Sequence, residues 1–412
     1  MSRVLGLTLG IVTALGGFVD IGEMVFASQA GARFGYALLW PVLLGALAIA
    51  VYAEMCGRVA IVSGKPVFEL VRDRLGYSVG FGALVASTVV NVLTCAAEVG
   101  GVALVLRLLT GLPYGWLLAA AVLVLILVVS VMPFEMIERV FGLMGLFMLV
   151  FIAAAIVLGI DWGATAGGLV PNVPAGLSSG GLISYGYFAV GLVAGTVMPY
   201  EAQFYSSGNI EEGKEPKELL DNALIAIIGM TFGSIVTMAI VVTAAEVLLP
   251  AGIIPERLGP AMLGPLPAFA SPGLLAALLG TLFAIGGAAI ETSLSGAYTV
   301  AQFLGYEWGK KDSPWHVPRF TLTWLAVFGL AVLVLATGID PVQVTEYAVI
   351  FSVVVLPLTY LPILLVARDR KVMGEHGNTR VHDILGVVFL VVITVVAVLA
   401  VPLMYLSRMG AA

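Results

Sequence analysis

The chain has 412 residues, of which 60% are hydrophobic and only 11% are charged, and its formal net charge is −6. Soluble domains carry about 25% charged residues, so this composition excludes an ordinary soluble protein. Apolar runs recur along almost the whole length and leave no room for a separate soluble domain. We therefore predict an all-α, polytopic membrane protein.

Eleven transmembrane helices are predicted, because each span needs about 20 mostly apolar residues. We place them at 4–30, 35–60, 78–108, 113–133, 139–160, 183–206, 221–248, 273–304, 319–338, 342–366 and 383–406. The first run is expected to be a retained helix and not a cleaved signal peptide, since Asp20 and Glu23 interrupt it where a signal peptide is purely apolar.

The basic residues predict how the chain is oriented in a cell (inner) membrane. Cytoplasmic loops carry an excess of Lys and Arg. With the N-terminus in the cytoplasm and the C-terminus outside, every Lys and Arg lies on the cytoplasmic side except Arg33, Arg107, Arg257 and Arg408. One helix more or fewer in the middle would destroy this asymmetry, so the asymmetry supports eleven spans.

The first predicted span is interrupted by glycines and acids. The stretch Gly16-Gly17-Phe18-Val19-Asp20-Ile21-Gly22-Glu23 places three glycines and two carboxylates near the middle of the membrane. Glycine disfavours a helix interior, and ionisable residues inside a span are rare and usually functional. We therefore expect this helix to be unwound in mid-membrane.

The sixth predicted span contains a second interruption, Gly195-Thr196-Val197-Met198-Pro199-Tyr200-Glu201. Pro199 has no N–H, so the carbonyl of Gly195 loses its helical partner. Unwound backbone at this depth is tolerated only where it lines a cavity or is buried in protein. The pattern therefore predicts a binding site formed by two broken helices.

Breaks in spans one and six are typical of transporters built from inverted repeats. We predict a single transmembrane domain over 1–412, with one repeat at about 1–162 (helices 1–5), a second at about 180–368 (helices 6–10), and an extra helix at 383–406. This prediction rests on the matching breaks, because the sequence identity between the two halves is too weak to show the repeat directly.

The residues at the breaks favour a cation. Asp20 and Glu23 offer carboxylate oxygens, Gly195 a free carbonyl and Met198 a thioether sulfur. Two carboxylates in one break repel each other unless a cation or a proton lies between them. The alternative is an ion pair with a basic residue, but nearly all Lys and Arg lie at the ends of the spans.

Several separated motifs are shared with a known family. Asp20–Glu23 reads D-I-G-E where the family has D-P-G-N, and Met198–Tyr200 reads M-P-Y where it has M-P-H. Arg33–Trp40, Arg58–Gly64 and Ala97–Gly100 also match family stretches. The chain thus resembles the Nramp family of proton-coupled divalent metal transporters, a branch of the LeuT-fold superfamily, from about residue 10 to Gly374.

The resemblance implies roles for individual residues. Its metal ligands become Asp20, Glu23 in place of asparagine, the carbonyl of Gly195 and Met198. Its glutamate on the proton route becomes Glu98, and the arginines of its ninth span leave one match, Arg319. The metal ion is then the substrate, and no cofactor is expected.

Other positions depart from the family pattern: Ile21 for proline, Cys95 for aspartate, Tyr200 for histidine and Val349 for glutamine. Tyrosine, with a reference pKa of about 10, does not readily shuttle protons near neutral pH. A coupled proton would therefore use an acid, for which the candidates are Glu23, Glu98, Glu201 and Glu291. The alternative for Glu98 is a hydrogen-bonded acid of the core.

Our leading hypothesis is a secondary transporter that moves divalent metal cations by alternating access, with protons coupled by a modified route. Met198 favours Mn²⁺ or Fe²⁺, whereas the added carboxylates suit Mg²⁺ or Ca²⁺, and the retained methionine favours the transition metals. The alternative is a LeuT-fold transporter of an amino acid or other organic solute, in which Asp20 and Glu23 bind a cationic group or a coupling proton.

The remaining expectations concern partners and chemistry. We expect the lipid bilayer, the metal ion and protons as partners, no nucleic acid, and a monomer. No enzyme activity is predicted, because the chain has no Ser/His/Asp set, no phosphate-binding loop and no histidine inside a span. Glu54 lies four residues before Arg58, the spacing of a structural ion pair on a helix.

Overall fold

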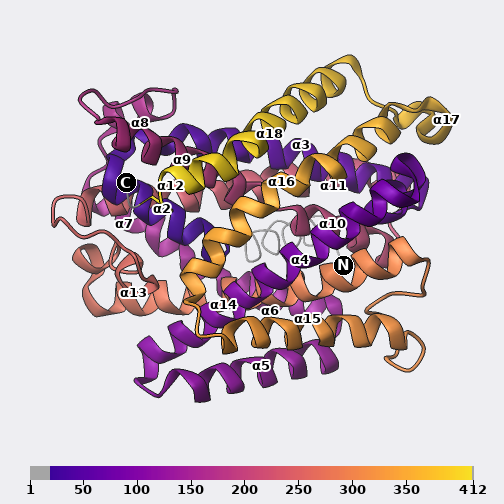
Figure 1. Cartoon of the computed structure of the whole chain (residues 1–412), viewed down its shortest axis with the longest axis horizontal. Coiled ribbons are helices and arrows are strands. Elements are labelled where there is room, and N and C mark those ends of the chain that lie inside the picture. Colours follow the sequence, from indigo (N-terminus) through magenta and orange to yellow (C-terminus); the bar gives the residue numbers. More distant parts are fainter. Residues whose placement is uncertain (1–18, 411–412) are drawn as a thin grey trace.

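A computed structural model describes residues 19–410, and within that range the regular secondary structure is entirely helical (Figure 1). Its α-helices are α2 (Ile21–Phe34), α3 (Leu39–Ser63), α4 (Val67–Thr110), α5 (Tyr114–Val131), α6 (Phe134–Gly145), α7 (Leu149–Leu158), α8 (Trp162–Gly168), α9 (Ser179–Thr196), α10 (Pro199–Glu211), α11 (Leu219–Leu224), α12 (Met230–Val247), α13 (Leu258–Ala261), α14 (Leu266–Leu304), α15 (Pro318–Ala336), α16 (Pro341–Arg368), α17 (Arg370–Met373) and α18 (Arg380–Leu406).

Ten stretches of the described residues are long and apolar enough to cross a membrane. The first of them, Ile21–Ser63, contains both α2 and α3. The first half of the predicted span 4–30, with Gly16 and Gly17, lies outside the described residues. Each later predicted span coincides with one or more helices, so the polytopic all-α prediction is confirmed, while the count of eleven stays a prediction.

Helices α4 and α14 begin well before the residues at which the hydropathy pattern placed them, and both bend. The backbone of α4 leaves helical geometry at Gly76, whose φ of 76° glycine adopts without the steric cost of a Cβ. The backbone of α14 does so at Ala270, two residues before Pro272. Each bend separates a short first segment from the long apolar helix that follows.

The apolar side chains divide into a packed interior and an exposed belt. In the interior, α4 packs against α14 and α16, and α2 packs against α12. On α5, at the edge of the molecule in Figure 1, Leu123, Leu127 and Val131 are exposed. Exposed apolar surface of this extent is unfavourable in water but suits contact with lipid chains.

The break predicted in span six has a structural counterpart, and the described part of span one starts at the other predicted break. Helix α9 ends at Thr196 and α10 begins at Pro199, which occupies the first helical position, where its missing N–H costs nothing. Met198 between them has extended backbone, with φ −77° and ψ 128°. Helix α2 begins only at Ile21, after an extended Asp20 with φ −91° and ψ 174°. The break in span six is therefore confirmed, and the second half of span one begins where its acids lie.

Candidate metal site

Asp20 is the N-cap of α2, and only one of its two carboxylate oxygens has a hydrogen-bond partner. Its Oδ1 accepts a hydrogen bond from the backbone N–H of Glu23 at 2.8 Å, as capping aspartates do. Its Oδ2 is buried and has no hydrogen-bond partner. The residue is only 1% exposed, so water does not cover this oxygen from outside. A buried carboxylate oxygen without a donor is costly unless a proton or a cation occupies it.

Glu23 lies one turn further along α2, and it too has one carboxylate oxygen without a hydrogen-bond partner. Its Oε2 accepts a hydrogen bond from the Thr237 hydroxyl of α12 at 3.0 Å, and its Oε1 has no partner. The residue is also 1% exposed. A Cβ placed on Gly195 would lie 3.6 Å from the Glu23 Cγ, which brings the carboxylate beside the break between α9 and α10.

No basic side chain of residues 19–410 pairs with either acid. The ion pairs among these residues involve other carboxylates, such as Glu54, whose Oε1 lies 2.8 Å from Arg58 Nε as predicted. The predicted alternative, that Asp20 and Glu23 are neutralised by Lys or Arg, is therefore not supported by the described structure. Two buried carboxylates, each with a free oxygen, remain near each other.

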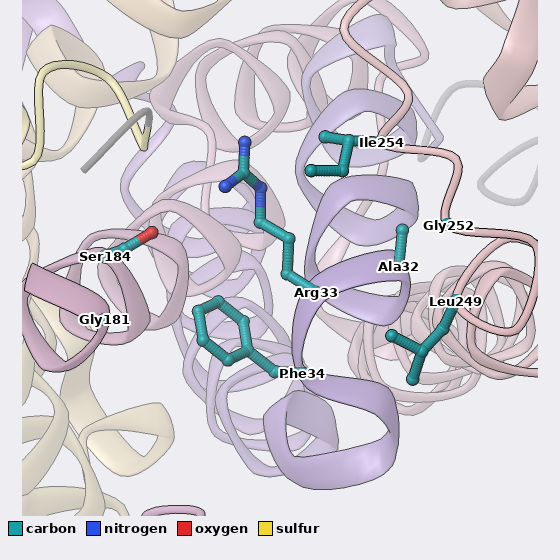
Figure 2. Close-up of a pocket in the computed structure, with 8 residues that line it drawn as sticks. All are labelled: Ala32, Arg33, Phe34, Gly181, Ser184, Leu249, Gly252 and Ile254. Atoms are coloured by element: carbon teal, nitrogen blue, oxygen red, sulfur yellow. The ribbon is translucent and has the colours of Figure 1, made fainter. Parts of the chain in front are cut away.

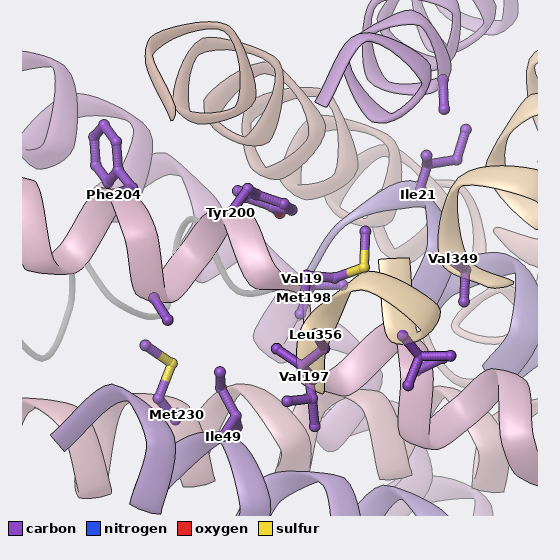
Figure 3. Close-up of a cluster of buried hydrophobic side chains, with 14 of the residues drawn as sticks. Val19, Ile21, Ile49, Val197, Met198, Tyr200, Phe204, Met230, Val349 and Leu356 are labelled. Atoms are coloured by element: carbon purple, nitrogen blue, oxygen red, sulfur yellow. The ribbon is translucent and has the colours of Figure 1, made fainter. Parts of the chain in front are cut away.

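Met198 supplies the sulfur of the site. It is fully buried, and its Sδ accepts a hydrogen bond from the Ser352 hydroxyl of α16 at 3.2 Å. Figure 3 shows the sulfur between the break of α9 and α10 and the side chains of Ile21 and Val349. Pro199 cannot donate to the Gly195 carbonyl, so this oxygen also lacks its helical partner.

Val349 forms an apolar wall of the site. A Cβ on Gly22 would lie 2.6 Å from its Cγ2, so α16 packs closely onto the first turn of α2 at a position where a larger residue would force Val349 to shift. Among the described residues, no group of three or more His, Cys, Asp and Glu side chains is close enough to hold a metal by itself. A metal ion here would need Met198 and the Gly195 carbonyl in addition to the two acids.

The predicted proton-coupling residues have different surroundings. Glu98 of α4 is fully buried, and both its carboxylate oxygens accept from the Ile21 N–H, at 3.3 and 3.4 Å. Tyr200 and Glu201 are buried in the first turn of α10, and the Tyr200 hydroxyl and Glu201 Oε2 have no hydrogen-bond partner. Glu291 is half-buried on α14.

Arg319 is not brought to this group. It is exposed at the start of α15, and its guanidinium lies 4.4 Å from the centroid of the Tyr306 ring. Two hydroxyl residues that were not predicted from the sequence contact the candidate ligands: Thr237 contacts Glu23, and Ser352 contacts Met198. The sequence shows each of them as a hydroxyl residue inside an otherwise apolar span. Hydroxyl residues that bond only to their own helix look the same, so the sequence does not distinguish the two cases.

A separate hollow of about 380 Å³ lies at the far end of α2. Its lining includes Arg33, Phe34, Ser184 and Ile254, with Arg33 extended between the two walls (Figure 2). The Arg33 guanidinium lies 5.4 Å from the centroid of the Phe188 ring. Since the lining residues include this cation and no carboxylate, the hollow is not a candidate metal site.

Comparison with known proteins gives a family match over nearly the whole chain. The model of the family described as natural resistance-associated macrophage protein-like (Nramp) matches residues 10–402. The chain belongs to the Nramp family. A relative from Deinococcus radiodurans, named divalent metal cation transporter MntH, is 26% identical over 399 residues, which cover 91% of this chain and 85% of the relative. Another MntH, from Brucella suis, is 26% identical over 378 residues, covering 87% and 79% of the two chains.

Solved structures show the same fold. The Nramp chain superposes on a manganese transporter from Eremococcus coleocola with a TM-score of 0.69 at 20% identity, covering 96% of this chain and 87% of the other. Mhp1, a nucleobase-cation-symport-1 family transporter in a closed conformation, gives a TM-score of 0.56 at 15% identity, with 98% and 92% covered. The LeuT-like fold class predicted from the resemblance is therefore confirmed.

Proposed function

We propose that this Nramp protein is a secondary transporter that moves divalent metal cations across the membrane by alternating access, and that the ion binds between the two helix breaks. The proposed ligands are Asp20 Oδ2, Glu23 Oε1, the Gly195 carbonyl and Met198 Sδ. The observation that carries the proposal is the pair of buried carboxylates, each with one oxygen that has no partner, beside a thioether and with no basic side chain of residues 19–410 paired with them. The names of the MntH relatives support the same cargo.

The chemistry of the donors favours Mn²⁺ or Fe²⁺ over Mg²⁺. Thioether sulfur adds affinity for softer transition metals, whereas Mg²⁺ and Ca²⁺ take oxygen ligands. Proton coupling, if it accompanies the metal, uses a modified route through Glu23, Glu98, Glu201 or Glu291, because the chain has Tyr200 where the family motif has histidine.

We further propose a monomer in the cell (inner) membrane with its N-terminus in the cytoplasm, its C-terminus outside, and the two inverted repeats at about 1–162 and 180–368.

The test is a panel of divalent ions in proteoliposomes, with internal pH recorded alongside metal uptake. Asp20→Ala and Asp20→Ser should both abolish uptake, although serine still caps the helix. The matched control is Asp161→Ala, which removes another capping aspartate, one that accepts from Ala164 N at 2.9 Å in an exposed loop. The control should transport normally.

Full metal uptake by a well-folded Asp20→Ser protein would refute the site. The competing hypothesis, an amino-acid or other organic-solute transporter, predicts no metal uptake by the wild-type protein. It also predicts no metal binding when a divalent ion is titrated into the purified protein in a calorimeter.

A further inference from the structure

A single backbone amide connects the candidate metal site to α4. The Ile21 N–H, the first amide of α2, points between the two carboxylate oxygens of Glu98, at 3.3 and 3.4 Å. The two residues are 77 positions apart in the sequence and both are fully buried. Since Ile21 directly follows Asp20, this contact lies one peptide bond from a proposed metal ligand.

A helix that begins inside a membrane must find acceptors for its first amides, because neither water nor lipid supplies them there. In α2, the Glu23 N–H is satisfied by Asp20 within the same helix. The Ile21 N–H is satisfied by Glu98 from another helix. The first contact fixes the shape of the turn, whereas the second fixes where the turn lies relative to α4.

The Ile21 side chain reinforces this attachment. A Cβ on Gly101 would lie 2.8 Å from Ile21 Cδ1, so the side chain packs onto α4 about one turn beyond Glu98. Residues three apart on a helix share a face. Ile21 therefore docks on one face of α4 by its amide and by its side chain.

We infer that Glu98 is a positioning residue for the metal site: by accepting the Ile21 N–H it holds the start of α2 against α4 and so sets the position of Asp20 Oδ2. The role needs a hydrogen-bond acceptor at position 98 and an N–H at position 21. It does not need a charge. The inference deepens the proposed function and rests on it in one respect, that Asp20 is a metal ligand.

The chain offers a direct way to remove the donor. Proline has no N–H, and it is well tolerated at the first position of a helix. The residue before a proline must be extended, and Asp20 already has φ −91° and ψ 174°. Ile21→Pro, which also restores the residue of the family motif, therefore removes the donor while α2 can still begin at this residue, but it also removes the Cδ1 contact with Gly101. Ile21→Val removes the same Cδ1 and keeps the N–H, so it is the matched control.

The acceptor can be removed with a matched pair. Glu98→Gln keeps an oxygen that accepts from Ile21, whereas Glu98→Met fills the same space without a comparable acceptor. The measurements are the dissociation constant for Cd²⁺ by calorimetry and, without metal, the hydrogen exchange of the backbone amides of residues 22–26.

We expect Glu98→Met and Ile21→Pro each to weaken Cd²⁺ binding about tenfold, and Glu98→Gln and Ile21→Val to change it less than about threefold. The double variant Ile21→Pro/Glu98→Met should be no weaker than either single variant, because both remove the same contact. Exchange of residues 22–26 should rise in Glu98→Met and stay at the wild-type rate in Glu98→Gln.

Two results would overturn the inference. One is a loss in Glu98→Gln equal to that in Glu98→Met, which would mean that the charge of Glu98 matters and not its acceptor. The other is a double variant about a hundredfold weaker than wild type, which would make the two residues independent. If the wild-type protein binds no metal, the proposed function fails, and the metal-free exchange experiment still decides whether Glu98 holds α2.

Discussion

Replacing Met198 by leucine separates the chemistry of its sulfur from the space that it fills. Leucine nearly conserves the volume, and such buried exchanges cost less than about 1.5 kcal/mol of stability. Met198→Ala would instead leave a cavity and cost about 2–5 kcal/mol. The Ser352 hydroxyl, which donates to the sulfur, also lies 2.7 Å from the Val349 carbonyl and keeps that acceptor in either variant. Met198→Leu therefore removes a ligand while leaving its surroundings satisfied.

We expect Met198→Leu to weaken Cd²⁺ and Mn²⁺ binding about tenfold, equivalent to about 1.4 kcal/mol. Mg²⁺ and Ca²⁺ binding should change much less, because these ions gain little from a thioether. The assay is calorimetric titration of each ion into the purified protein, followed by uptake competition in proteoliposomes. An equal loss for all four ions would show that Met198 only shapes the cavity. No loss for any ion would mean that oxygen ligands alone make the site and that the preference for transition metals is wrong.

Four further substitutions test other parts of the molecule. Glu23→Asn keeps an oxygen for the ion and for the Thr237 hydroxyl but removes a charge, so metal uptake should persist with a changed ion preference or pH profile; identical profiles would show that Glu23 takes no part. Gly195→Ala should transport normally, since its Cβ would lie 3.6 Å from Glu23 Cγ, which is ordinary van der Waals contact. Gly31→Ala should fail to fold, because its Cβ would overlap the Val241 carbonyl. Expression level and metal uptake are the measurements for both variants. Arg58→Ala should lower stability by about 3–5 kcal/mol, because it leaves Glu54 buried without its partner; an unchanged melting temperature would contradict this.

The parts of the fold that could be predicted from the sequence depend on local rules. Pro199 removes the helical hydrogen bond to the Gly195 carbonyl and starts a new helix, and Asp20 caps the residues that come directly after it. The helices after the first span were located because apolar length is set by the thickness of the bilayer. Each of these inferences needs only residues within one or two turns of each other.

The contacts that complete the site are long-range and could not be predicted in the same way. Thr237 reaches Glu23 across 214 positions, and Ser352 reaches Met198 across 154. Neither hydroxyl differs in type or spacing from those that bond within their own helices, such as Thr88, which donates to Leu84. The early starts of α4 and α14 were missed for a related reason, because hydropathy does not register a bend at Gly76 or Ala270.

The close packing of Val349 on Gly22 has a consequence for the hydration of the cargo. The Val349 side chain presents methyl groups and offers an ion no oxygen ligand, and the hydroxyl that α16 brings to the candidate ligands is that of Ser352, beside Met198 Sδ. Ca²⁺ takes about six to eight oxygen ligands, and Mg²⁺ requires an octahedral shell and gives up water reluctantly. The donors that we assign fall short of either number, and the remainder of the shell would be water that travels with the ion. An ion that binds here would therefore keep part of its hydration shell, and the apolar wall limits how many ligands the protein itself supplies.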